Sequence, residues 1–195
     1  MSWEYLVSLD IGSIHDYIFG TNKLREIRGA SILLDKLNRE LPLEAINNVS
    51  RYGNQNKDWK AVVLGGGNIK ILFNDKDKAE AYKGYLEDIF RKDAPGSNIT
   101  IIISERKGET EEQWLKRAER ELQREKSLHK ENRQIITSGF FKACESCGLY
   151  PAEKEDRRPE GIRHICKSCH QKVAESKNYQ NTEINRELSK GRNGF

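Results

Sequence analysis

AVVLGGGNIKILF, residues 61–73, decides the fold, because it places two apolar runs on either side of three glycines. In the second run, residues 68–73, successive side chains are expected to point to opposite faces of a strand, so the pattern has a period of two. Consecutive glycines supply the positive φ angles that a tight hairpin turn requires. The stretch therefore predicts a β-hairpin that turns at residues 65–67.

A strand and two helical segments are predicted upstream of this hairpin. Residues 5–10, YLVSLD, have the alternation of a buried strand, and Gly12 with Ser13 interrupts it. Ser13 is a plausible N-cap for a helix that begins at Ile14. Helical spacing by threes and fours then resumes, and Pro42 with the polar stretch of residues 47–58 closes this element. The residues on this second helical stripe are Leu24, Ile27, Ala30, Leu34, Leu37 and Leu41.

Downstream of the hairpin, a helix and a strand complete the pattern. Residues 76–90 have helical periodicity, and residues 99–103 are almost all β-branched, as in a strand. The order strand, helix, strand, strand, helix, strand is that of the split-βαβ plan. We therefore predict an α+β fold, with a ferredoxin-like palm domain over residues 1–105, which is the plan of polymerase and cyclase palms.

The remainder of the chain is predicted to form a helical linker and a small metal module. Residues 106–137 include a highly charged helix with a thin apolar stripe, formed by Trp114, Leu115, Ala118 and Leu122. Glycine, proline and cysteine appear from residue 138 onward. We predict a Cys₄ zinc module with a C-terminal helix over residues 138–195.

The cysteines carry the strongest chemical signal in the sequence. All four lie in two CxxC pairs separated by 18 residues: Cys144, Cys147, Cys166 and Cys169. This spacing is typical of a structural Cys₄ zinc site, in which four ligands leave no open position for a reactive water. Disulfides and free buried thiols are the alternatives, and a cytoplasmic location disfavours disulfides. His164 and His170 flank the second pair, but the four cysteines are a complete set without them.

Asp10 and the glycine turn are the candidate nucleotide-binding features. An active palm holds two divalent cations with one carboxylate at the end of the first strand and others in the hairpin turn. Asp10 has the first position, but the turn supplies only glycines and the neutral Asn68. We therefore predict no catalytic residues and no two-metal nucleotidyl transfer by this domain alone. Glycines there can admit a phosphate or ribose, although a simple hairpin turn explains them equally well.

Composition and charge set broad limits on function. The chain is 36% hydrophobic and 33% charged, and no apolar run approaches the length of a membrane span. It lacks the pattern of a signal peptide, so a cytoplasmic location is the default. The net charge of +4 arises from residues 105–195. This basic half, and the cluster of Lys23, Arg25 and Arg28, could contact nucleic acid or phosphate, or could be ordinary solvated helix faces.

Three segments together resemble one protein family. They are DIGSIHDYIFGTNKLREIRGASILL at residues 10–34, the GGGN turn followed by IKILF, and CESCGLYPA with the later ICKSC. In this order they resemble the first palm and the zinc module of the large, polymerase-like subunit of type III CRISPR effector complexes. The resemblance covers nearly the whole chain.

The resemblance implies a role in antiviral defence. The family's subunit senses target RNA bound by a crRNA-guided complex, and its paired palms join ATP into cyclic oligoadenylates. A second palm with a GGDD turn supplies the metal carboxylates, whereas the first palm holds one ATP, with Mg²⁺. Carried onto this chain, the nucleotide-binding residues are Asp10, Ile11, Gly12, Ser13, Ser31, Gly65, Gly66, Gly67 and Asn68.

This chain departs from the family pattern in two respects, since it shows no HD nuclease segment and no GGDD turn. The expected partners are therefore a second palm, in the same or a separate chain, other subunits of the crRNA-guided complex, and RNA, but no membrane. We expect the chain alone to be inactive as a cyclic oligoadenylate synthase. The alternatives are a stand-alone zinc-containing module that binds RNA or protein, and a self-sufficient cyclase dimer.

Overall fold

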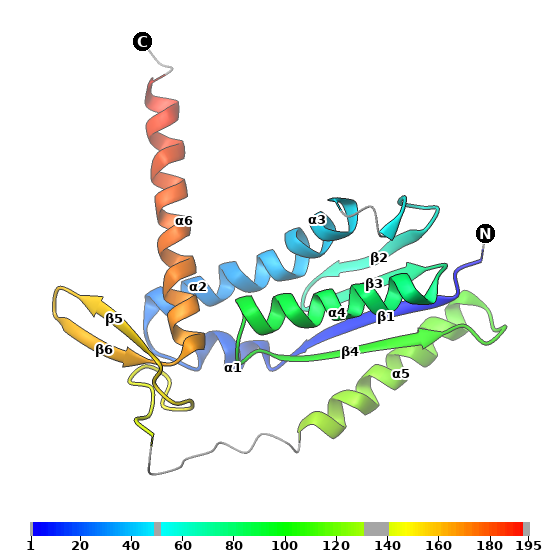
Figure 1. The fold of residues 1–195 in the computed structure, drawn as a ribbon, viewed down its shortest axis with the longest axis horizontal. Coiled ribbons are helices and arrows are strands. Elements are labelled where there is room, and N and C mark those ends of the chain that lie inside the picture. Colours follow the sequence, from blue (N-terminus) through cyan, green and yellow to red (C-terminus); the bar gives the residue numbers. More distant parts are fainter. Residues whose placement is uncertain (1, 49–51, 131–140, 193–195) are drawn as a thin grey trace. The chain divides into compact units, whose positions relative to one another are not determined.

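The computed structural model describes residues 2–48, 52–130 and 141–192, and its central feature is a four-stranded antiparallel sheet (Figure 1). The strand order is β2-β3-β1-β4. Their bounds are Tyr5–Gly12 for β1, Trp59–Gly65 for β2, Asn68–Phe73 for β3 and Asn98–Glu105 for β4. This order, with β1 paired to both β3 and β4, is the ferredoxin-like arrangement, so the predicted fold class is confirmed.

The helices alternate with the strands as predicted, with one difference. Between β1 and β2 lie α1 (Ile14–Phe19), α2 (Leu24–Asp35), the π-helical turn η1 (Lys36–Glu40) and α3 (Leu41–Asn48). Pro42 does not end the helical segment, because it lies in the first turn of α3, which ends at Asn48 within the predicted polar stretch. Proline has no N–H to donate, and the π-helical turn η1, in which the N–H of Leu41 donates to the carbonyl of Lys36, directly precedes α3.

The other helices follow the hairpin and the cysteine motifs. α4 (Lys76–Asp93) connects β3 to β4, and α5 (Glu111–Lys130) follows β4. A second hairpin, β5 (Lys154–Arg158) and β6 (Gly161–Ile165), leads into the long α6 (Lys167–Arg192). None of the helices in the described part of the chain combines the length and the apolar character needed to cross a membrane.

The chain divides into two compact units, which are described separately below. The sheet unit comprises Met1–Ile14 and Leu34–Gln134, and the cysteine unit comprises His15–Leu33 and Ile135–Phe195. Residues 15–33, which follow β1 directly in the chain, therefore pack with the segment that carries the cysteines. The boundaries near residues 105 and 137 stay predictions.

Both faces of the sheet bury apolar side chains, because neighbouring residues of a strand point to opposite faces. On one face, α4 packs against β1, β3 and β4, and its Tyr82 ring lies 5.5 Å from that of Phe73. On the other face, α5 contacts β1 and β4. There Leu6 and Leu72 form a buried cluster with Trp114 and Ala118.

Three of the four residues of the predicted apolar stripe of α5 are buried, Leu115 is partly buried, and polar pairs flank the stripe. Trp114, Ala118 and Leu122 are at most 1% exposed. Beside them, Lys70 contacts Glu119 at 2.5 Å and the Ser104 hydroxyl donates to Glu121 at 2.7 Å. The apolar stripe and these pairs together fix how the charged helix lies on the sheet.

Candidate metal centre and nucleotide site

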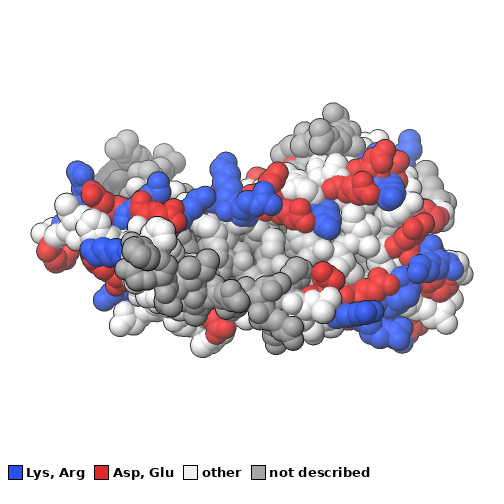
Figure 2. Space-filling view, turned by 60° about the horizontal axis from the view of Figure 1, so that its bottom comes forward, with Lys and Arg blue, Asp and Glu red and all other residues white. Residues whose placement is uncertain are grey.

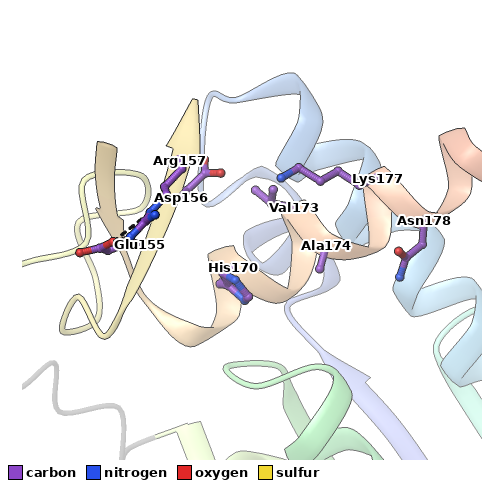
Figure 3. A pocket seen from close by; sticks show the side chains of 8 residues that line it. All are labelled: Glu155, Asp156, Arg157, His170, Val173, Ala174, Lys177 and Asn178. Carbon is purple, nitrogen blue, oxygen red and sulfur yellow. Dashed lines mark hydrogen bonds and ion pairs between the residues drawn. The ribbon is translucent and has the colours of Figure 1, made fainter. Parts of the chain in front are cut away.

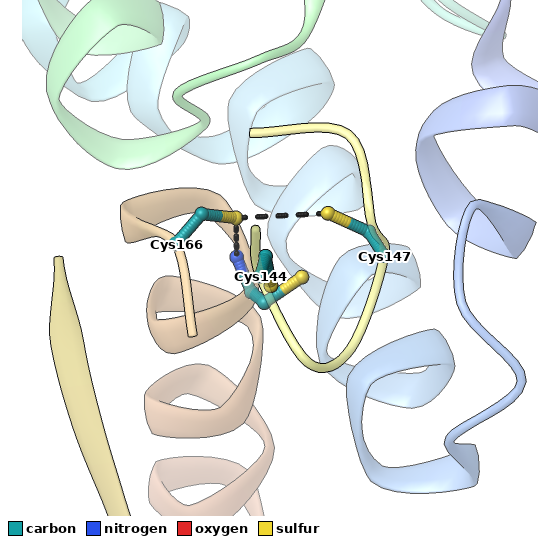
Figure 4. Close-up of side chains that lie close together, drawn as sticks. Cys144, Cys147 and Cys166 are labelled. Carbon is teal, nitrogen blue, oxygen red and sulfur yellow. Dashed lines mark hydrogen bonds between the residues drawn. The ribbon is translucent and has the colours of Figure 1, made fainter. Parts of the chain in front are cut away.

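The four cysteines come together in the cysteine unit. Their sulfur atoms all lie within 4.8 Å of one another, and Cys144, Cys147 and Cys166 point toward a common centre (Figure 4). The Sγ atoms of Cys147 and Cys166 are 3.8 Å apart, and all four cysteines are free, which excludes the disulfide alternative. A tetrahedron of sulfurs around a zinc ion, with Zn–S bonds of about 2.3 Å, has edges of about 3.8 Å. The residues therefore fit one tetrahedral metal ion.

Each CxxC pair is shaped by its own backbone. In the first pair, the N–H of Gly148 donates to the carbonyl of Cys144 at 2.9 Å, and Gly148 has a φ of 69°. This left-handed conformation favours glycine. The second pair opens α6, where the N–H of Cys169 donates to the Cys166 sulfur at 3.4 Å. The start of a helix favours thiolates because its free N–H groups and dipole are positive.

The sulfurs influence one another's protonation strongly. Thiol hydrogen bonds from Cys166 and Cys169 lower the pKa of Cys147. The same contact with Cys147 raises the pKa of Cys166 to about 12 and also raises that of Cys169. Four thiolates can therefore share this buried space only if a cation replaces their protons. His164 and His170 do not belong to the cluster of possible ligands within the described residues.

The candidate nucleotide site lies in the sheet unit, where the end of β1 meets the glycine turn. Asp10 pairs directly with Asn68, and the N–H of Ile11 donates to the carbonyl of Gly67 at 2.8 Å. The two segments that the sequence analysis combined are therefore adjacent. Their role in nucleotide binding stays a prediction.

The hairpin itself accounts for the central glycines. Gly66 and Gly67 have φ values of 63° and 86°, which are typical of a two-residue type I′ turn. A Cβ on Gly67 would lie 2.6 Å from Cδ1 of Ile14, whereas a Cβ on Gly66 would meet no atom within 4 Å. Gly66 therefore faces open space that a ligand can enter.

The other predicted nucleotide-binding residues have different surroundings. Ser13 has a φ of 52°, so it starts α1 from a left-handed conformation and not from the extended one that is usual for an N-cap. Gly12 pairs with Asn98, whose Nδ2 would lie 2.9 Å from a Cβ at that position. Ser31 belongs to the cysteine unit, where its exposed hydroxyl donates to the carbonyl of Ile27 at 3.2 Å.

Lys126 is a residue of this site that the sequence analysis missed. Its ammonium group forms an ion pair with Asp10, and the two side chains are 24% and 12% exposed, respectively. Lys126 is one of many basic residues on a mixed-charge helix, so no local signal singles it out. Within the described residues, no cluster of three or more acidic or histidine ligands forms here or elsewhere. A single carboxylate that already has a cationic partner is a poor holder of two metal ions.

The basic cluster at the start of α2 is partly used inside the cysteine unit. The Arg28 guanidinium donates twice to the Ser176 hydroxyl, from Nε at 3.0 Å and from Nη2 at 2.9 Å. The expectation that Ala30 and Leu34 are buried is confirmed, at 0% and 4% exposure. Arg28 thus has an internal structural contact on α6.

A pocket with a volume of about 390 Å³ lies beside β5 and α6 in the cysteine unit (Figure 3). Its walls carry charges of both signs, which favours no single class of ligand. The lining residues are Glu155, Asp156, Arg157, His170, Val173, Ala174, Lys177 and Asn178.

No family model and no curated protein matches the chain. Among solved structures, a Csm1–Csm4 cassette in complex with cA4 is similar, with a TM-score of 0.49 and 17% identity over 85% of this chain and 25% of the compared chain. A cassette in complex with AMPPNP gives a TM-score of 0.48 and 20% identity, over 66% and 19% of the two chains. The apo cassette gives 0.46 and 19% identity, over 71% and 20%.

These cassettes belong to type III CRISPR effector complexes, the class whose large subunit the sequence motifs resemble. At such identities the likeness concerns the fold alone, and the nucleotides named are ligands of the compared proteins. This chain spans only 19% to 25% of the length of the compared chains.

Proposed function

We propose that this chain is part of the large subunit of a type III CRISPR effector complex. In this proposal its palm is the ATP-binding, non-catalytic half of a composite cyclic-oligoadenylate synthase site, and its four cysteines hold a structural zinc ion. The sequence motifs provide the link to the family, and the geometry at the end of β1 supports a palm that binds ATP without catalysing its transfer.

The observation that carries the proposal is the pairing of Asp10 with Asn68 beside an open glycine turn. Backbone N–H groups at such a turn can approach phosphate or ribose oxygens. The chemistry of nucleotidyl transfer needs more negative charge than Asp10 supplies, particularly because Lys126 is its ion-pair partner. The arrangement therefore suits binding of ATP, with Mg²⁺ held mainly by the nucleotide and by a partner.

Zinc is the metal that best suits the four cysteines. A closed tetrahedral set of thiolates favours zinc or an iron–sulfur centre over hard cations such as Mg²⁺. The 3.8 Å separation between the Sγ atoms of Cys147 and Cys166 fits a single ion. With four ligands in place, the ion would organise the fold and would not activate water.

Activity in this proposal requires a second palm with a GGDD turn, in the same or a separate chain. Other subunits of the crRNA-guided complex and its RNA are the remaining partners. The alternative, a zinc-containing module that binds RNA on its own, would benefit from a continuous basic surface. Figure 2 shows acidic and basic side chains interspersed on the face it presents.

Titration calorimetry with ATP, with and without Mg²⁺, tests the palm proposal. The informative variant is Gly66→Asn, because asparagine tolerates the φ of 63° and adds a side chain to the open space at the turn. Gly108→Asn is the matched control, since Gly108 also has a positive φ, of 83°, and open surroundings. We expect weak binding by the wild type, a roughly tenfold loss (~1.4 kcal/mol) in Gly66→Asn, and no loss in the control.

Three results would contradict the proposal in different ways. Equal affinity of the wild type and Gly66→Asn would place the nucleotide elsewhere. Release of pyrophosphate from ATP by the wild-type chain alone would show that it is a complete enzyme. Binding of RNA without any binding of ATP would favour the stand-alone module.

A further inference from the structure

Residues around the metal centre contact a segment that lies more than a hundred positions earlier in the sequence. Within the cysteine unit, the hydroxyl of Ser146, inside the first CxxC pair, lies 3.0 Å from that of Thr21 and also contacts the buried carboxylate of Glu26. Arg163 of β6 donates to the same carboxylate at 2.9 Å. The loop that carries two metal ligands is therefore tied to the α1–α2 segment.

Lys172 makes a second connection, between this segment and the helix that carries Cys169. It lies one turn after Cys169 on α6 and is only 5% exposed. Its ammonium group donates to the carbonyl of Tyr17 in α1 at 2.5 Å and lies 3.9 Å from the centre of the Tyr17 ring. A lysine is seldom buried this deeply without negative charge nearby.

Cys169 and Lys172 are both buried and lie three residues apart in α6, so their side chains share one face of this helix. Burial lowers the pKa of Lys172, and the charges of Cys169, Cys147, Cys166 and Glu26 oppose this effect, with Glu26 the smallest of the four. Four thiolates around one divalent cation carry a net charge of −2. In a buried setting such a charge needs a cation close by.

The backbone at Lys172 is equally constrained. A Cβ on Gly29 of α2 would lie 1.8 Å from the carbonyl oxygen of Lys172, so α2 and α6 approach each other at a point that only glycine permits. One turn further along α6, Ser176 accepts the two hydrogen bonds from Arg28. Lys172 is thus fixed by α2 on its backbone side and by α1 at its ammonium group.

We propose that Lys172 is the charge-compensating residue of the metal centre, and that through its bond to Tyr17 the bound metal holds α1 and the start of α2 in place. The inference rests on the metal site proposed above and extends its role. The metal stabilises residues 15–33 of the cysteine unit as well as the loops that carry its own ligands.

Zinc affinity tests the first half of this proposal. Competition with a chromophoric chelator is measured for the full-length wild type, Lys172→Met, Lys172→Arg and the control Lys177→Met, an exposed lysine on the same helix. Loss of an outer-shell partner typically weakens metal binding by about tenfold or more. We expect this loss for Lys172→Met, affinity closer to the wild type for Lys172→Arg, and no change for Lys177→Met.

Hydrogen exchange tests the second half and needs no variant. In the zinc-loaded full-length chain, amides of residues 17–30 should be protected, and removal of zinc should release them while β1 and β3 keep their protection. Unchanged exchange in residues 17–30 would overturn the coupling. Equal zinc affinity of Lys172→Met and Lys177→Met would overturn charge compensation. Failure of the wild type to bind zinc would instead refute the metal site itself.

Discussion

The metal centre and the end of β1 differ in how completely the chain equips them. The four cysteines of the proposed metal centre converge, with their sulfurs within 4.8 Å of one another, and four is the number that a closed tetrahedral site needs. At the end of β1, one carboxylate faces an asparagine across the sheet and a lysine from α5. In our proposal, the four cysteines form their site within one chain, whereas the single, ion-paired carboxylate depends on a partner for metal chemistry.

The largest effect is expected from substitutions that disrupt only the metal centre. Cys144→Ser or Cys169→Ser should abolish tight zinc binding and unfold residues 141–170, because structural zinc contributes on the order of 10 kcal/mol to the folding of small zinc modules. Elemental analysis and hydrogen exchange measure the two effects. His170→Ala is the control, since His170 lies beside Cys169 without joining the ligand cluster. A fully folded, metal-free wild type would contradict this prediction.

A second substitution breaks the sheet unit and leaves the metal centre intact. Trp114 is fully buried between α5 and the sheet, so Trp114→Ala should cost about 3–5 kcal/mol of unfolding free energy. Urea denaturation measures this loss, while zinc content should stay at about one ion per chain. The exposed Arg120→Ala on the same helix should change little. Loss of zinc in Trp114→Ala would show that the two regions do not fold separately.

Two helical glycines, one in each unit, should respond to alanine substitution with opposite changes in stability. Gly29→Ala would drive a methyl group into the backbone of Lys172, so it should destabilise the cysteine unit by about 1–3 kcal/mol. Gly84 in α4 has no atom within 4 Å of its Cβ position, so Gly84→Ala should stabilise the sheet unit by about 0.5–1 kcal/mol. Thermal unfolding followed separately in each unit distinguishes the two. Equal effects would mean that the close approach of α2 to α6 is not maintained in solution.

The smallest expected effect is the part of the acid sensitivity that arises from carboxylates of the sheet unit. Hydrogen bonds from Arg117 lower the pKa of Glu109, and those from Lys70 lower the pKa of Glu119. Because these folded-state pKa values are depressed, the stability they provide is present above the unfolded pKa of about 4.3 and is lost as pH falls through the folded values.

Urea midpoints measured from pH 7 downward should therefore decline below about pH 4.3. Arg117→Met should flatten this decline, because it removes the partner of Glu109. Lys116→Met should leave the decline unchanged, since the Lys116–Glu112 pair is 70% and 78% exposed. Identical pH profiles for the two variants would exclude Arg117 as the source of the effect.

The sequence by itself determined the features that depend on local pattern. Alternation in residues 68–73 and the glycines before them specified β3 and its turn, because a strand has a period of two and a type I′ turn needs positive φ. The two CxxC motifs identified the four cysteines that come together, since each motif brings two sulfurs together within a few residues. Helical spacing likewise identified the buried stripe of α5.

Only the tertiary structure decided which distant residues meet. Lys126 faces Asp10 because α5 lies across β1, and Lys172 faces Tyr17 because α6 packs against residues 15–33. Neither lysine stands out in a chain with 34 basic residues. Periodicity along the sequence reports which side of a helix or strand is buried, but it contains no information about the partner that covers it. The charge of a buried group therefore acquires its role only from the packing that excludes water around it.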